Sequence, residues 1–528
     1  MRKEFKIFAL VLIVPIIAAT LLGCTPRSVT QQPAGGGHFI FAWVSDLPTW
    51  DPDRTTWSEL PQSLIYDGLV ELDMDGNVTG RLARRWELSE DGLRWRFFLR
   101  EDVYFHSGRK MTADAVKFRF DRMRQPDGAN RGMVSSIQEV NVIDTYTVEF
   151  VLSFPDPTLW NIFGSAFFGA IIDPVAVAEL GEEFGAKPVG TGPWIIEEHV
   201  SGSHLTLRRN ENYRWGATYW DNQGPPHMEK ITFRFIPDET TRMLEIAQGS
   251  VDYTFVPPGE TARLRQNNRV NVITYPGNGI TYWGFNMKKW PWTDESVRNA
   301  MQFAINKEGI TQHALEGLAR PLWSALPPSI AGFNQAHEDE LRARFPFSPD
   351  RARATLEAGG WVRGTDGIYA KDGQSLRVSV WVRNDPLQVR IAEMIESDLA
   401  AVGVDLVIEI VEQARITSDT PQGLHQSLIW QYGWWDPIIL WFVFRDGGIR
   451  MHHVNEELHN LLLTGHQTVD NAERMQIYLQ AQRLLAEQNP WVVLYFPEVI
   501  VAFSDRVENI RINHRGPGLI VNDLRLTR

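Results

Sequence analysis

The sequence predicts an α/β protein made of two or three globular units. From Phe39 onward, short apolar runs alternate with helical patterns, which is typical of α/β proteins. Residues 376–410 contain a complete strand–helix–strand unit, and such crossovers build parallel or mixed sheets. The chain has 528 residues, too many for a single hydrophobic core.

The elements of this crossover follow from the spacing of its apolar residues. Every second residue is apolar in 376–382 and again in 404–410, which predicts two strands. Apolar residues between 392 and 402 recur at helical spacing, so we expect a helix there. Gly403 stands where it can end that helix in the left-handed conformation.

Two further helices are predicted from apolar stripes. Residues 297–305 have apolar positions at helical spacing, and Asp294 before them favours a helix start. A second stripe is formed by Ile477, Ala481 and Leu484, behind an Asp-x-x-Glu start and before an Asn-Pro stop.

The first residues predict export. Basic residues at positions 2, 3 and 6 precede an apolar run, which is the order of a secretory signal. A membrane-spanning anchor is the alternative, but 7–22 is shorter than the roughly 20 apolar residues that a bilayer requires, and Pro15 lies inside it.

Cys24 ends the apolar run in the sequence Leu-Leu-Gly-Cys, which resembles a lipoprotein signal box. It is the only cysteine of the chain, so it has no disulfide partner there. We expect residues 1–23 to be removed and the Cys24 thiol to carry lipid, which would anchor the protein to a membrane without spanning it. Residues 24–37 are then a flexible tether, and the protein is exported to the periplasm or to the outer face of the cytoplasmic membrane.

Charge and composition restrict the partners. The formal net charge is −13, and an acidic surface argues against nucleic acid. Aromatic residues make up 11% of the chain, and we expect most of them to pack in the core.

A series of sequence blocks lies along most of the chain. The most specific block lies within 93–123, where Thr112 can cap a helix whose Val116, Phe120 and Met123 face inward. The blocks are 47–52 (LPTWDP), 65–70 (IYDGLV), 81–87 (RLARRWE), 97–100 (FFLR), 103–108 (VYFHSG), 111–116 (MTADAV), 189–194 (VGTGPW), 209–213 (RNENY), 247–252 (AQGSVD), 285–286 (FN) and 297–300 (VRNA). In their order and spacing they resemble the bacterial extracellular solute-binding proteins of family 5, the peptide, dipeptide and nickel type.

The resemblance implies a two-lobed periplasmic-binding-protein fold of type II, with an extra inserted domain and a hinge between the lobes. It implies a substrate-binding protein of an ABC importer that passes a peptide or similar solute to a permease and its ATPase subunits. We expect no cofactor, no metal and no enzymatic activity, and we expect a monomer. The predicted units are lobe I (38–60, 187–275 and 495–528), inserted domain II (61–186) and lobe III (276–494).

The segment 430–437 (WQYGWWDP) departs from the pattern of the peptide-binding relatives. In them a segment of the form Trp-x-x-Asp-x-x-Asp/Glu-Pro lines the cleft, and its first Asp holds the peptide ammonium. Trp430 keeps the family spacing to the proline, so Gly433 stands at the ammonium-binding position. A bound peptide would then need another carboxylate, and the candidates are Asp46 and Asp436.

Aromatic residues offer a second interpretation of the ligand. Flat aromatic faces beside carboxylates and amides suit sugar rings, so an oligosaccharide or glycoside is an alternative ligand for the same fold. Neighbouring residues of a strand face opposite sides, so at least one of Trp434 and Trp435 is expected to be core. The candidate ligand-binding residues are Asp46, Trp283, Phe285, Asn286, Trp430, Tyr432, Gly433, Trp434, Trp435 and Asp436.

Other activities have weaker support. His452, His453 and His459 could suggest a metal site, but we expect them in an exposed, polar stretch. A secreted, lipid-anchored hydrolase is a third alternative, because a glycosidase also uses Trp platforms and paired carboxylates. The sequence has no Gly-x-Ser-x-Gly or His-Glu-x-x-His motif.

Overall fold

The structure is a computed structural model that describes residues 36–55, 60–74, 76–445, 448–513 and 518–527. The predicted signal peptide, Cys24 and all but the last two residues of the predicted tether lie outside this range. Among the described residues, no helix combines the length and the apolar character needed to cross a membrane.

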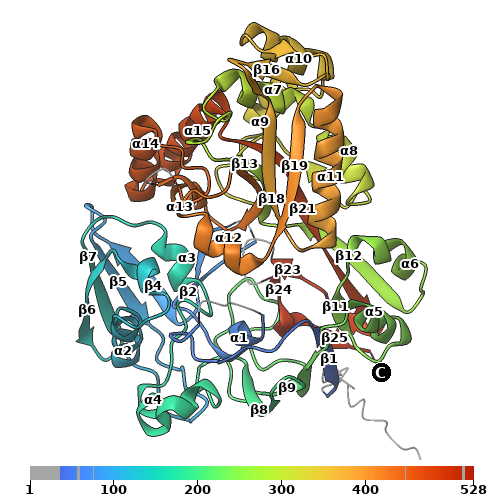
Figure 1. The fold of residues 1–528 in the computed structure, drawn as a ribbon. Helices are drawn as coiled ribbons and strands as arrows, with labels where there is room; N and C mark the ends of the chain where they lie inside the picture. The colour runs from blue at the N-terminus through green and yellow to red at the C-terminus, as the bar shows by residue number, and fades with distance from the viewer. Residues whose placement is uncertain (1–35, 56–59, 75, 446–447, 514–517, 528) are drawn as a thin grey trace, which may run out of the picture. The chain divides into compact units, whose positions relative to one another are not determined.

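A long mixed sheet runs through the described chain (Figure 1). Its strands follow the order β19-β18-β20-β13-β21-β11-β1-β10-β9-β8, and β12 and β14 also pair with β21. The bounds are β1 (His38–Trp43), β8 (Trp194–Val200), β9 (His204–Arg209), β10 (Lys230–Phe235), β11 (Tyr253–Phe255), β12 (Val270–Pro276), β13 (Gly279–Phe285), β14 (Ala319–Pro321), β18 (Arg377–Arg383), β19 (Asp405–Val411), β20 (Ser427–Gly433) and β21 (Trp491–Ser504).

The strand β21 joins the two parts of this sheet. Its first half pairs with β13 and β14, and its second half pairs with β11 and β12. The predicted boundary between 494 and 495 therefore falls inside a continuous strand. The domain boundaries as a whole stay a prediction.

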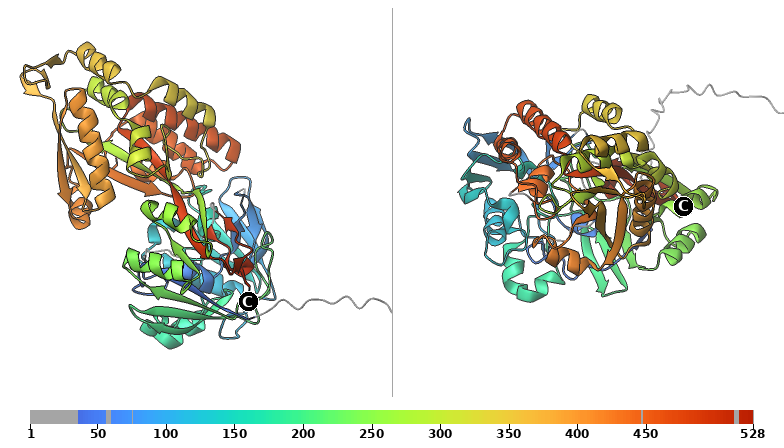
Figure 2. Two further views of the ribbon diagram at one scale, coloured as in Figure 1. Left: turned by 90° about the vertical axis from the view of Figure 1, so that its right-hand side faces the viewer. Right: turned by 45° about the horizontal axis from the view of Figure 1, so that its top comes forward.

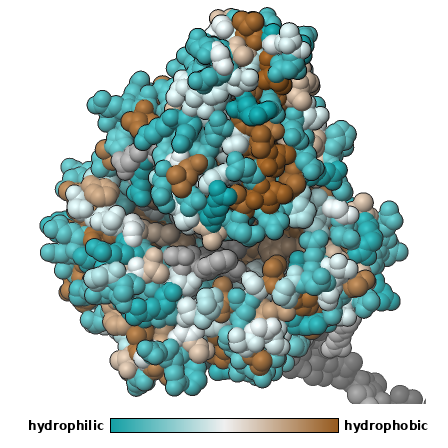
Figure 3. Space-filling view, in the orientation of Figure 1, coloured by the Kyte–Doolittle hydropathy of each residue, from teal (hydrophilic) through white to brown (hydrophobic). Residues whose placement is uncertain are grey.

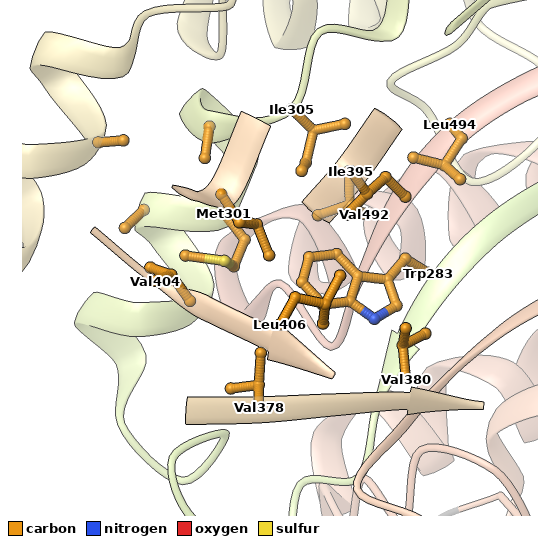
Figure 4. Close-up of a cluster of buried hydrophobic side chains, with 14 of the residues drawn as sticks. Trp283, Met301, Ile305, Val378, Val380, Ile395, Val404, Leu406, Val492 and Leu494 are labelled. Atoms are coloured by element: carbon orange, nitrogen blue, oxygen red, sulfur yellow. The ribbon is translucent and has the colours of Figure 1, made fainter. Parts of the chain in front are cut away.

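The predicted crossover is confirmed. β18 and β19 are parallel, and α11 (Pro386–Ala401) connects them and packs against both (Figures 1 and 2). Gly403 has a φ of 79°, the left-handed conformation expected after the helix. Ile395 of α11 meets Val380 and Leu406 of the strands in one buried cluster, which also contains Trp283 (Figure 4).

A separate antiparallel sheet lies within residues 83–152. Its order is β4-β5-β7-β6, and α2 (Ala113–Met123) packs against β6 and β7. Val116, Phe120 and Met123 of α2 are buried as predicted. Thr112 is at the N-cap, but its side chain makes no capping hydrogen bond. The strands are β4 (Ala83–Leu88), β5 (Arg94–Leu99), β6 (Ile137–Asp144) and β7 (Thr147–Leu152).

Two other helix predictions are confirmed with one correction. α7 (Glu295–Ala304) starts at Asp294, whose side chain accepts a hydrogen bond from the Ser296 N–H. α15 (Asn471–Gln488) follows its N-cap Asp470, and Ala481 of the predicted stripe is buried, but Ile477 and Leu484 are only partly buried and the neighbouring Tyr478 and Leu485 are buried instead. The predicted stripe was displaced by about one residue, because the helix also buries polar positions that an apolar pattern ignores.

The remaining elements are shorter or peripheral. They are α1 (Leu60–Ile65), β2 (Val70–Leu72), β3 (Val78–Gly80), η1 (Arg131–Val134), α3 (Leu159–Phe163), α4 (Pro174–Leu180), η2 (Gly181–Gly185), α5 (Glu239–Gln248), η3 (Pro258–Glu260), α6 (Thr261–Arg265), α8 (Lys307–His313), α9 (Gln335–Arg344), α10 (Pro349–Ala358), β15 (Val362–Arg363), β16 (Tyr369–Lys371), β17 (Gln374–Ser375), α12 (Gln413–Asp419), α13 (Ile439–Phe444), α14 (Glu456–Gln467), β22 (Val507–Glu508), β23 (Ile512–Asn513), β24 (Gly518–Leu519), η5 (Val521–Asp523) and β25 (Arg525–Leu526).

The edge strand β19 exposes apolar side chains. Val407 and Ile410 are about half exposed, and Figure 3 shows hydrophobic residues gathered where Figure 1 draws β18 and β19. Nothing in the described chain covers this edge.

Candidate functional site

The strand β20 contains the first half, 430–433, of the segment that was predicted to line the ligand cleft. It pairs antiparallel with β13, and Gly433 lies opposite Gly279 at the end of the ladder. Gly433 is exposed. The guanidinium carbon of Arg450 lies 4.6 Å from the Trp430 ring centre, so the protein itself covers that aromatic face. The Tyr432 hydroxyl donates to the Ala325 carbonyl, and burial raises the pKa of Tyr432 well above its usual value, so it remains a neutral donor.

The neighbouring strand β13 does not present its side chains to a ligand. Trp283, Phe285 and Asn286 have no exposed surface. The Trp283 indole donates to the Ser427 hydroxyl, and the Asn286 amide donates to the Gly423 and His425 carbonyls. The reason is the position of β13 in the sheet, where hydrophobic clusters cover both of its faces. The expectation that β13 faces the ligand is therefore corrected.

The two carboxylates considered as substitute anchors are engaged within the protein. Asp46 lies 3.0 Å from His199 Nε2 and accepts a hydrogen bond from the Gly202 N–H. Asp436 forms a two-pronged ion pair with Arg474 of α15, and it also accepts from the Ile438 N–H. Both groups therefore stabilise local structure in this arrangement.

Trp434 and Trp435 lie beyond the end of β20, so strand alternation does not separate them. Both are partly buried, and their ring centres are 5.2 Å apart. Trp434 lies between Phe168 and Phe442, with ring centres 6.3 and 6.2 Å away. Trp435 instead lines a pocket.

This pocket has a volume of about 180 Å³, and its walls are mostly apolar. Besides Trp435, it is lined by residues of α1, β2, α3, β24 and η5 and by residues of several loops. They are Leu60, Ser63, Leu64, Glu71, Leu72, Arg81, Asn161, Gly164, Ser165, Ala166, Phe167, Pro193, Trp220, Leu519, Ile520, Val521 and Asn522. Of the predicted ligand-binding residues, only Trp435 lies in this pocket.

Sequence reasoning missed the charged end of the pocket. Arg81 is buried, and its guanidinium binds Glu71 and also Asp67, which lies 2.5 Å away. The Arg81 carbon Cζ is 4.3 Å from the Trp220 ring centre. The signal that could have drawn attention to Glu71 is its charge within the apolar run 69–72, but charged residues occur in many strands.

Two tyrosines complete this network. Tyr213 accepts from Arg81 and donates to Asp67, over distances of 3.1 and 3.2 Å. The Tyr219 hydroxyl donates to Glu71 Oε1 at 2.5 Å. Burial raises the pKa of both tyrosines, so their hydroxyls remain protonated at neutral pH and donate to the carboxylates.

The histidines considered for metal binding lie in a different environment from the predicted one. His453 is buried rather than exposed, and burial lowers its pKa. His452 Nε2 lies 2.9 Å from the Thr420 carbonyl oxygen. Within the described ranges, no group of three or more His, Cys, Asp or Glu side chains could hold a metal ion.

The fold defines the class of protein. The chain resembles the oligopeptide-binding protein AppA from Bacillus subtilis, solved with a nonapeptide, with a TM-score of 0.74 at 21% identity over 94% of this chain and all of that one. It also resembles NikA from Brucella suis, solved with Fe(III)-EDTA, with a TM-score of 0.83 at 23% identity over 93% of this chain and all of that one. The fold is thus the two-lobed type II solute-binding fold, as predicted.

The family follows from the sequence. The family model described as bacterial extracellular solute-binding proteins, family 5 Middle, matches residues 77–445, and the chain belongs to that family. It is 26% identical to the dipeptide-binding protein of Escherichia coli over 98% of this chain and 95% of that protein. It is also 26% identical to the glutathione-binding protein GsiB of Salmonella typhimurium, over 90% of this chain and 92% of that one. Members of this family are substrate-binding proteins.

Proposed function

We propose that this protein is the lipid-anchored receptor of an ABC importer, which captures a peptide or similar small solute and delivers it to the permease. Family membership supports the role of solute capture. The leader and Cys24 support export and anchoring, because their order is that of a lipoprotein signal. Labelling of the full chain with palmitate tests the anchor. We expect the wild-type protein to be labelled and the Cys24→Ser variant not to be labelled.

The observation that carries the proposal is the pocket under Trp435. Its walls come from segments that lie far apart in the sequence, from Leu60 to Asn522, and they converge on one mostly apolar space. Apolar walls with a few polar groups are the usual composition of a small-molecule site. Its 180 Å³ is below the roughly 300–1,000 Å³ of pockets for drug-sized ligands, so it suits a small solute or one end of a longer one.

Peptides are the favoured ligand class. The relatives named as dipeptide-binding and glutathione-binding proteins support this choice. The second candidate is a sugar, because the rings of Trp220, Trp435 and Phe167 all line the pocket, and flat rings stack well on sugars.

Binding tests the proposal. We expect di- to pentapeptides to raise the melting temperature of the protein lacking residues 1–24, since a ligand at 100 times its Kd stabilises the folded state by about 2.7 kcal/mol. Trp435→Ala should weaken binding by about 30-fold, the loss typical of a buried aromatic anchor. The matched control is Trp290→Ala, because Trp290 is 37% exposed and does not line the pocket. Equal peptide affinity in both variants would show that the ligand does not bind in the pocket lined by Trp435.

A further inference from the structure

We infer that Glu71 is the carboxylate that receives the ammonium group of the ligand. This inference rests on the proposed function and specifies its substrate class, solutes with a free primary amine. The position that holds the ammonium in peptide-binding relatives is Gly433 here, which has no side chain to offer.

The charges in the pocket wall favour a cationic ligand group. Asp67 and Glu71 are two buried carboxylates that share the single guanidinium of Arg81. In the part of the chain that the structure describes, neither carboxylate has an ion pair with a second cation. With both carboxylates ionised, the network has one excess negative charge in a buried environment, where an uncompensated charge is unfavourable. A cationic ligand group would neutralise it, whereas an anion would be repelled.

Only one of the two carboxylates is placed to meet a ligand. Asp67 is surrounded by donors, since it accepts from Trp215, Thr191 and Tyr213 as well as pairing with Arg81. Glu71 lines the pocket, and it accepts one hydrogen bond on each oxygen, from Arg81 and from Tyr219. A carboxylate has about four acceptor positions, so Glu71 can accept further hydrogen bonds from an ammonium.

A second polar group in the pocket wall favours the same chemistry. Asn522 is 2% exposed and lines the pocket. Its amide nitrogen donates to the Asn222 and Gly224 carbonyls, which fixes the orientation of the amide. Its Oδ1 has no hydrogen-bond partner among the described residues. An unpaired buried acceptor costs free energy unless a donor meets it, and an ammonium brings three donors.

The guanidinium of Arg81 indicates which chemical group of the ligand lies next to the ammonium. Its Nε–H is buried and meets no acceptor within the described ranges. A neutral carbonyl oxygen would satisfy this donor without adding negative charge to the network. An ammonium next to a carbonyl is the arrangement at the amino terminus of a peptide, whereas neutral sugars have no ammonium.

The other candidate anchors do not compete with Glu71. Asp46 is held by His199 and Gly202, and Asp436 is held by Arg474. Neither lines the pocket. The Trp435 ring in the same walls adds attraction for a cation and removes water from it.

The sharpest test changes the ligand and leaves the protein intact. Alanyl-leucine, alanyl-phenylalanine and trialanine are titrated calorimetrically into the protein lacking residues 1–24, each with a free and with an acetylated amino terminus. Acetylation removes the positive charge, so we expect the affinity to fall by about 30-fold or more.

The complementary test changes Glu71. Glu71→Gln keeps the shape of the side chain and should weaken binding of the free peptides by a similar factor, about 30-fold. The matched control is Asp252→Asn, which alters another fully buried carboxylate that pairs with an arginine, Arg506, and lies outside the pocket. Its affinity should stay within about twofold of the wild type, because distant sites act independently.

Each outcome decides the inference. Equal binding of free and acetylated peptides, or unchanged affinity of a folded Glu71→Gln protein, would overturn it while solute capture stands. If the Glu71→Gln protein does not fold, the comparison of free and acetylated peptides on the wild-type protein still tests the inference. Binding of oligosaccharides alone would also overturn the inference and leave the receptor function intact. If no peptide or oligosaccharide binds, both the inference and the proposed function fail.

Discussion

At the residue scale, Lys307 shows how burial controls charge in this protein. Lys307 is 2% exposed, and its ammonium nitrogen lies 3.2 Å from the Leu322 carbonyl oxygen. No carboxylate is within ion-pair distance of it in the described chain; the nearby Glu338 binds the Trp323 and Ser324 N–H groups. Burial lowers the pKa of Lys307 to about 7, although Glu338 and Glu308 oppose this shift.

Lys307→Met should stabilise the protein at neutral pH. The pKa of Lys307 is about 7 in the folded state and about 10.4 in the unfolded chain, so the unfolded chain binds more protons between these values. The contribution of Lys307 to stability therefore rises with pH from about 7 to about 10. Replacing the buried charge by an apolar side chain should raise the free energy of unfolding by about 1 kcal/mol or more at pH 7.

Urea unfolding of both proteins at pH 6, 8 and 9.5 checks this prediction. The difference between variant and wild type should shrink as the pH rises. A variant that is less stable at every pH would contradict the expected cost of burying Lys307.

The site shows at this same scale what the sequence could and could not predict. Trp435 was a candidate because the segment 430–437 resembles a family segment with known spacing; it lines the pocket, and its contact with a ligand stays a prediction. Glu71 and Arg81 were missed because their role depends on meeting Trp220 and Tyr219, which lie about 140 positions away and have no local signal. Trp283 was expected to face the ligand but is buried. An aromatic strand has the same sequence pattern whether its side chains face the protein core or a ligand cleft.

At the element scale, the β18–α11–β19 crossover was predictable because its information is local. The alternation of apolar residues in the strands, their helical spacing in α11 and the glycine that ends the helix can each be recognised from a short stretch of sequence. The pairing of β21 with both parts of the sheet was not predictable in the same way, because residues that face each other across the strands, such as Thr281 and Tyr495, are distant in sequence. The displaced stripe of α15 shows a further limit, since Arg474 is buried there by its ion pair with Asp436.

The glycine at the end of α11 supplies the test at this scale. A Cβ at Gly403 would lie 2.7 Å from the Gly367 carbonyl oxygen, and its φ is 79°. Gly373 has the same φ of 79° and no atom within 4 Å of such a Cβ. We expect Gly373→Ala to cost about 1 kcal/mol, from backbone strain alone. Gly403→Ala should cost about 1–3 kcal/mol more, because the added methyl also clashes. Chemical denaturation measures both, and equal losses would contradict the clash.

At the scale of the whole molecule, one contact joins the sheet of β4 to β7 with the helices after β20. His466 at the end of α14 lies 3.3 Å from Asp156, which follows β7. The Phe154 ring is 5.7 Å from the His466 ring. Burial alone would raise the pKa of Asp156, but hydrogen bonds involving His466, Ser136 and Thr158 outweigh it and lower the pKa.

This contact predicts a defined pH dependence. Because the pKa of Asp156 is depressed on folding, its stabilising contribution is present above the usual Asp pKa of about 3.9 and is lost as the pH falls below it. His466→Asn should therefore lower stability by about 1 kcal/mol at pH 6, with little effect near pH 2. The control is His204→Asn, whose ring lies 3.3 Å from Glu198 in an exposed pair and should contribute close to nothing. Equal effects of the two variants at pH 6 would contradict the importance of burial.

Binding of one peptide per chain is the central claim at this scale, and calorimetric titration of the protein lacking residues 1–24 tests it most directly. We predict saturable binding of a peptide to one site per chain, with a negative heat-capacity change from burial of the pocket's apolar walls and the peptide recovered unchanged. Absence of saturable binding to any peptide or oligosaccharide, or recovery of a cleaved ligand, would contradict the assignment as a solute receptor.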